Sequence, residues 1–182
     1  MLPMTVILEP EKWDAEKDEF IPPVTQTVQL EHSLISISKW ESKWCKPFIS
    51  TTEMTIEETI DYIKCMTLTQ NVKPEIYEHV TDSNVSQIRD YIGAPMTATT
   101  FSDRTKKKNK EIITSELIYY WMIALNIPFD PCQKWHLNRL ITLIRICQAK
   151  NEPPKKGRSK RNLAAEYARL NAERRKALNT TG

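Results

Sequence analysis

Residues 111–147 read EIITSELIYYWMIALNIPFDPCQKWHLNRLITLIRIC, the most apolar and aromatic stretch of the chain. Apolar residues cover more than one face of its first half, which is typical of a buried helix. Pro128 cannot continue that helix, and Asp130 with Pro131 is typical of a helix start. The second half repeats apolar residues at helical spacing. We therefore expect a helical hairpin at the core of the fold. Its central residues are expected to be Leu117, Trp121, Trp135, Leu140 and Ile144.

The N-terminus predicts a pair of strands joined by an acidic, turn-like segment. Residues 4–8 are β-prone, and residues 24–30 alternate between apolar and polar side chains. A lone two-stranded ribbon is only marginally stable. It must therefore either pack on the helices or pair with another chain. We favour packing on the helices. The second possibility makes the edge of the ribbon a candidate surface for self-association.

Shorter helical patterns lie between the ribbon and the hairpin. Ser33 is expected to cap a helix that places Trp40 and Trp44 on one face, as core residues rather than as anchors for a partner. Thr55 and Glu58 form the capping-box pattern of a helix over 55–68. A short helix over 74–80 and another from Asp82 or Ser83 to Gly93 complete the set, and residues 94–110 read as an exposed loop.

These patterns predict a mainly α fold, namely a compact helical domain with an N-terminal β-hairpin and a basic C-terminal helical extension. The expected parts are a ribbon over 1–31, a helical core over 32–147, a linker over 148–159 and a basic helix with its tail over 160–182. Pro153, Pro154 and Gly157 mark the linker because each interrupts a helix.

Composition excludes several classes of function. The chain has only three glycines, too few for a glycine-rich phosphate loop. No apolar run approaches the roughly 20 residues of a membrane-spanning helix. The first residues lack the basic start of a signal peptide. We expect a cytoplasmic protein that neither binds nucleotides through such loops nor enters a membrane.

No set of side chains predicts catalysis or a cofactor. The four cysteines match no zinc-binding spacing. Cys132 and His136 lie four residues apart, as two metal ligands on one helix would, but structural zinc requires four ligands. We favour an ordinary packed pair there and expect neither a bound metal nor enzymatic activity.

The clearest functional signal is the charge of the C-terminal segment. Between Lys155 and Lys176 nine basic residues stand against two glutamates, so this segment carries +7 while the whole chain carries +3. A helix of this length is marginal in water by itself, so we expect it to bind a partner. The expected partner-binding residues are Arg158, Lys160, Arg161, Leu163, Tyr167, Leu170, Arg174, Arg175 and Lys176.

Several segments resemble one family of small tailed-bacteriophage proteins. They are SLISISKWESKW (33–44), TIEETIDYIKCMTLTQNV (55–72), MTATTF (96–101), the first half of the 111–147 stretch, KWHLNRLITLIRIC (134–147) and NAERRKALNTTG (171–182). The chain is similar to tail assembly chaperones, which are encoded near the tape-measure protein. The resemblance covers most of the chain from about residue 30, and the N-terminal ribbon carries least of it.

The resemblance implies a non-enzymatic tail morphogenesis factor in the host cytoplasm. Such a protein would bind the tape-measure protein and help tail-tube subunits to polymerise around it. A virion structural or connector protein of the tail or of the head–tail junction is the alternative. A nucleic-acid-binding accessory protein is less favoured, because the tail has one aromatic residue, Tyr167, and no base-stacking platform.

Overall fold

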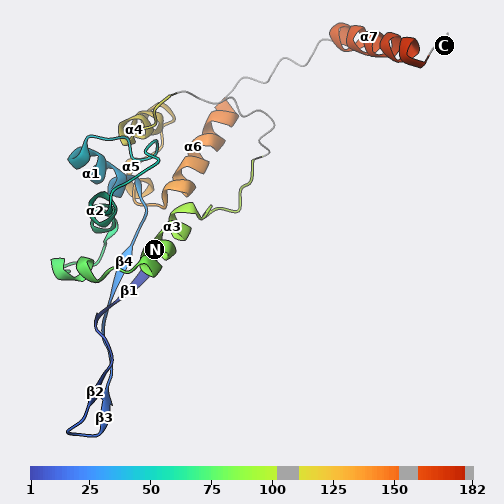
Figure 1. Cartoon of the computed structure of the whole chain (residues 1–182). Coiled ribbons are helices and arrows are strands. Elements are labelled where there is room, and N and C mark those ends of the chain that lie inside the picture. Colours follow the sequence, from blue (N-terminus) through green and yellow to red (C-terminus); the bar gives the residue numbers. More distant parts are fainter. Residues whose placement is uncertain (102–110, 152–159, 179–182) are drawn as a thin grey trace. The chain divides into compact units, whose positions relative to one another are not determined.

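The computed structural model describes residues 1–101, 111–151 and 160–178 (Figure 1). These form two compact units, 1–147 and 148–182, which are described separately. The strands are β1 (Leu2–Glu9), β2 (Lys12–Asp14), β3 (Glu19–Ile21) and β4 (Val24–Leu30). The helices are α1 (Leu34–Trp44), α2 (Ile56–Met66), the 3₁₀ helix η1 (Pro74–His79), α3 (Asp82–Gly93), α4 (Ser115–Ala124), α5 (Phe129–Cys132), α6 (Leu137–Asn151) and α7 (Lys160–Leu178).

The predicted mainly α class is wrong. Helices make up 53% of the chain and strands 15%, so the fold is mixed α/β with two small antiparallel sheets. The error came from residues 9–21, where charged residues hide the strand pattern. In addition, the ribbon contributes buried side chains to the main core, instead of lying beside a helical domain.

The base of the ribbon pairs β1 with β4 in antiparallel register, from Leu2 opposite Leu30 to Glu9 opposite Val24. Its inner face buries Met4, Val6, Val28 and Leu30, while the outer face carries threonines that pair across the strands. Packing on the helices, the favoured expectation for this ribbon, holds for its base. Asn84 of α3 donates a hydrogen bond from Nδ2 to the carbonyl of Thr5 at 3.1 Å, which ties the base to the helices.

The acidic segment that was expected to be a turn is instead a second small hairpin. β2 and β3 pair with Trp13 opposite Phe20, and their rings meet edge to face with centroids 4.7 Å apart. Such cross-strand aromatic pairs stabilise a hairpin despite poor local strand propensity. We call residues 9–21 the ribbon tip, which extends away from the helices of the same unit (Figure 1).

Local capping signals place the first helices as predicted. Ser33 caps α1, and Thr55 with Glu58 forms the reciprocal capping box of α2. The cap of α3 is Thr81, one residue before the predicted position. Trp40 is fully buried and donates from Nε1 to the carbonyl of Glu58 at 3.0 Å, so α1 and α2 are locked together by a satisfied polar contact as well as by apolar packing.

The core is shared by the ribbon and all helices of the first unit, and the 111–147 stretch supplies only part of it. Of the residues expected there, Leu140 and Ile144 are buried, whereas Leu117, Trp121 and Trp135 are half-buried. The outer side of α4 leaves Tyr120 and Ile123 exposed. Fully buried residues outside the 111–147 stretch include Leu34, Ile37, Trp40, Ile63 and Met66.

The second helix of the expected hairpin begins later than predicted. Asp130 has extended backbone angles inside the short helix α5 and does not cap α6. Instead His136 forms an isolated β-bridge with Ser33, and the N–H of Leu137 donates to the carbonyl of His32 at 2.8 Å. Residues 133–135 form a turn and a bend, and this long-range pairing at residue 136 separates them from α6, which begins at Leu137.

α6 continues to Asn151 and so overlaps the start of the predicted 148–159 linker. The rest of that linker lies outside the described residues. Among the helices that the structure describes, none is both long enough and apolar enough to cross a membrane.

Candidate functional site

Helix α7 carries the predicted partner-binding residues. Arg158 lies outside the described residues, and for Lys160, Arg161 and Leu163 only the helical backbone is described. Every described side chain of α7 is exposed to solvent. Tyr167 and Leu170 are 60% and 44% exposed, which leaves their apolar surface uncovered within this unit.

The spacing along α7 gives the helix one distinct face. Tyr167, Leu170 and Arg174 follow one another at intervals of three and four residues, so they lie on the same side. Arg175 and Lys176 follow in the last turn, where cations interact favourably with the helix dipole. Arg169 is engaged with Glu173 at 3.2 Å. This face therefore offers a narrow apolar strip that ends at Arg174, while Arg175 and Lys176 add two cations to the same last turn on other sides of the helix.

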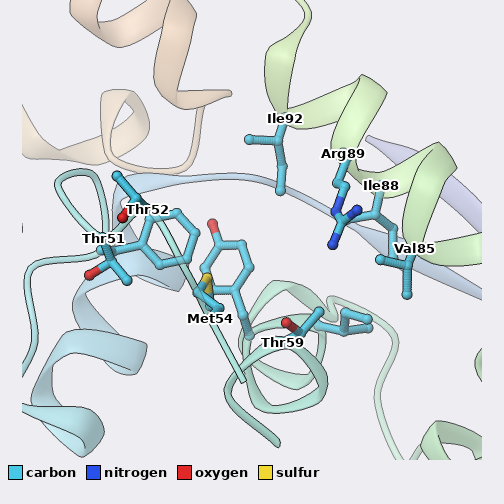
Figure 2. Close-up of a pocket in the computed structure, with 11 residues that line it drawn as sticks. Thr51, Thr52, Met54, Thr59, Val85, Ile88, Arg89 and Ile92 are labelled. Carbon is cyan, nitrogen blue, oxygen red and sulfur yellow. The ribbon is translucent and has the colours of Figure 1, made fainter. Parts of the chain in front are cut away.

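A pocket of about 420 Å³ lies in the first unit between α2, α3 and the segment that joins α1 to α2 (Figure 2). Val85, Ile88, Arg89 and Ile92 line it from α3, opposite Thr51, Thr52 and Met54 of the joining segment. Phe48, Thr59, Tyr62 and Ile63 complete the wall. The lining is an apolar surface edged by threonine hydroxyls and one guanidinium.

The polar groups of this pocket are hydroxyls and one guanidinium. Among the described residues that line it there is no carboxylate, imidazole or thiol. The sequence does not reveal this pocket, because its walls come from a loop and two helices that no local pattern brings together.

A group of buried polar residues lies where the ribbon meets the helices. The Tyr91 hydroxyl donates to Glu31 Oε1 at 2.7 Å, and the N-terminal ammonium of Met1 lies 3.0 Å from Glu31 Oε2. Nearby, His32 Nδ1 and the Tyr62 hydroxyl are 2.5 Å apart. The rings of His32 and His136 meet edge to face at 5.1 Å.

Both of these imidazoles are held neutral by burial. Burial and the nearby His136 lower the pKa of His32 to about 3, and burial lowers the pKa of His136 despite its bond to the Tyr91 carbonyl. His136 Nε2 donates to that carbonyl at 3.1 Å, while Nδ1 accepts from the N–H of Asn138 at 3.3 Å. The pair is therefore a satisfied structural contact between segments distant in the sequence.

The structure separates the residues that were weighed as a metal pair. Cys132 ends α5 and His136 precedes α6, so the two do not share one helix as expected. His136 is instead turned toward His32 and Tyr91. Within residues 1–101, 111–151 and 160–178, no group of three or more metal-ligating side chains comes together.

Three further buried carboxylates also have structural partners. Glu41 accepts the N–H of Phe48 at 2.8 Å and that of Ser115 at 2.7 Å. Glu58 is paired with Lys46, which lowers its pKa. Burial raises the pKa of Asp61, but its bonds from Lys43 and Trp44 outweigh burial and lower that pKa overall.

Comparisons with known proteins add no relative: neither a family model, nor a curated protein, nor a solved structure matches the chain.

Proposed function

We propose that this chain is a non-catalytic tail assembly chaperone of a bacteriophage, which binds the tape-measure protein through α7. The observation that carries the proposal is the character of α7, a separate basic helix whose Tyr167 and Leu170 are uncovered. A helix of this kind covers an apolar strip on a helical partner and pairs its cations with acidic residues beside that strip.

In the proposed mechanism the first unit provides a stably folded domain and the second unit binds the client. The first unit has its own core of buried residues, so it stays folded whether or not α7 is bound. The second unit shields the client until the tail-tube subunits replace it. Shielding is needed because large exposed apolar surfaces lead to aggregation.

The buried polar groups support a binding role over an enzymatic one. In the part of the chain that the structure describes, Glu31, Glu41, Glu58, Asp61, His32 and His136 each have a structural hydrogen-bond or ion-pair partner. Groups that hold segments together are poorly placed to exchange protons with a substrate.

The test is co-purification of the full chain with the tape-measure protein from nuclease-treated infected cells. Arg174→Glu/Arg175→Glu should weaken the complex about tenfold, because two attractive pairs become repulsive. Lys39→Glu/Lys73→Glu changes the same charge at exposed positions of the first unit and should bind normally. Equal binding by wild type and by the α7 variant would remove α7 from the mechanism.

A virion structural or connector role is the second candidate, and the exposed ribbon tip favours it, since such a projection suits a permanent contact between subunits. Purified particles distinguish the two functions. A chaperone should be absent from them, whereas a structural protein should be present at a fixed copy number. Loss of every bound protein on nuclease treatment would instead identify nucleic acid as the ligand of the basic helix.

A further inference from the structure

The ribbon tip is an exposed surface that is both acidic and aromatic. Residues 9–21 contain six carboxylates and two lysines, a net charge of −4. Trp13 and Phe20 are 51% and 66% exposed although they pack against each other. Large side chains of this kind, uncovered together at the end of a projection, are typical of an interaction site.

Several of the tip carboxylates are available to a partner. Glu9 pairs with Lys12 at 2.9 Å, and Asp14 accepts the N–H groups of Glu16 and Lys17 within its own turn. Glu11, Glu16 and Glu19 are exposed and make no ion pair with any residue that the structure describes. Negative charge thus borders the aromatic pair without being neutralised locally.

Helix α7 has the complementary character. Residues 160–178 contain six cations and two glutamates, a net charge of +4, which is equal and opposite to that of the tip. Its exposed Tyr167 and Leu170 lie beside the cations, just as Trp13 and Phe20 lie beside the carboxylates. Charge complementarity of this kind selects a partner and its orientation, while the apolar groups supply contact area.

We propose that the ribbon tip of one copy binds helix α7 of a second copy. Trp13 and Phe20 pack against Tyr167 and Leu170, while Glu16 and Glu19 pair with Arg174 and Arg175. Each copy carries both surfaces, so the contact is heterologous and builds rings or chains of copies. This contact can be measured without the proposed client, because the measurement needs only the purified chain.

Sedimentation velocity of the full chain over a range of concentrations tests the proposal. The average mass should rise with concentration at low salt and fall at high salt, because exposed charge pairs are screened. Glu16→Lys/Glu19→Lys brings the net charge of the tip from −4 to 0 and so removes its complementarity to the basic α7. Arg174→Glu/Arg175→Glu likewise brings α7 from +4 to 0 and removes its complementarity to the acidic tip. Each variant alone should associate about tenfold more weakly than wild type.

Mixing the two variants is the decisive step. In an equimolar mixture the unchanged acidic tip of the α7 variant meets the unchanged basic α7 of the tip variant, and the substituted lysines meet the substituted glutamates, so association should return. Lys39→Glu/Lys73→Glu matches the charge change of the α7 variant and should associate like wild type. Trp13→Ala/Phe20→Ala should associate about tenfold more weakly at unchanged net charge, and its circular dichroism should remain that of a folded chain.

Two results would overturn the proposal. A wild-type chain that stays monomeric at every concentration would show that the tip does not bind a second copy. The proposal would then be wrong even if the tip bound α7 of its own chain. Association that persists in Arg174→Glu/Arg175→Glu, or that does not return in the mixture, would place the contact elsewhere. Neither result bears on the client, which is measured separately by co-purification.

Discussion

Glu41 shows how one buried residue joins segments that are far apart in the sequence. Its two carboxylate oxygens accept the N–H of Phe48, after α1, and the N–H of Ser115, the first residue of α4. A negative charge at the start of a helix also interacts favourably with the helix dipole. Nothing in the local sequence around Glu41 predicts this role, because both partners are set by the tertiary fold.

We predict that Glu41→Ala destabilises the first unit by about 2–4 kcal/mol, because the buried N–H of Ser115 and the part-buried N–H of Phe48 lose their acceptor. Urea denaturation followed by circular dichroism measures this free energy of unfolding. Glu53→Ala, in the exposed segment before α2, is the matched control and should change it by less than about 0.5 kcal/mol. Equal effects of the two substitutions would contradict the assigned role.

His32 makes stability depend on pH. Burial and His136 lower its pKa to about 3 in the folded chain, whereas an unfolded histidine has a pKa of about 6.5. Between these values the unfolded state binds more protons, so stability is complete above about pH 6.5 and falls as the pH falls. His136, whose pKa burial also lowers, contributes in the same direction.

We predict that the free energy of unfolding drops by at least about 2 kcal/mol from pH 7 to pH 5, the amount expected from His32 alone. Denaturant titrations at a series of pH values measure it. His32→Gln should reduce this dependence, while His79→Gln, at an exposed position, should keep it. The same slope in both variants would mean that other groups control the response.

At the scale of elements, the ribbon tip is separable from the ribbon base. Among the described residues β2 and β3 pair only with each other, whereas Met4, Val6, Val28 and Leu30 of the base are buried in the core. We predict that replacing residues 10–23 with Asn-Gly, which suits a two-residue hairpin turn, leaves the thermal midpoint within a few degrees of wild type. Glu9 and Val24 already face each other across the turn position.

Differential scanning calorimetry measures that midpoint, and Met4→Ala supplies the contrast. Met4 is fully buried at the base, so its truncation should cost about 2–5 kcal/mol and lower the midpoint clearly. If the tip replacement were as destabilising as Met4→Ala, the tip would have to contribute to the core, contrary to its exposure.

Elements fixed by local chemistry were predictable from the sequence, and those fixed by distant pairing were not. Ser33 and Thr55 cap their helices through hydrogen bonds within three residues, so their patterns placed α1 and α2. The start of α6 depends instead on the pairing of His136 with Ser33, which overrode the cap-like Asp130. The β2–β3 pair was missed because its main stabilising contact, Trp13 with Phe20, joins residues across a turn.

The same distinction applies to the candidate sites of the whole molecule. The basic segment around α7 was visible in the sequence because charge is a property of composition. The pocket beside Arg89 was not visible, because α3 and the segment after α1 meet only in the folded unit. The exposure of Trp13 and Phe20 was also hidden, since aromatic residues are found both in cores and on binding surfaces.

The final prediction concerns the whole molecule, because the proposed functions make two uses of α7. If α7 binds both the tape-measure protein and the ribbon tip of a second copy, the two complexes compete, and each must weaken the other. A soluble fragment of the client, added in excess, should therefore dissociate the assemblies seen by sedimentation. Glu16→Lys/Glu19→Lys, whose tip no longer occupies α7, should bind the client at least as tightly as wild type. A client that binds without reducing the average mass of the assemblies would show that the two surfaces act independently, since linkage allows no other result when one helix is shared.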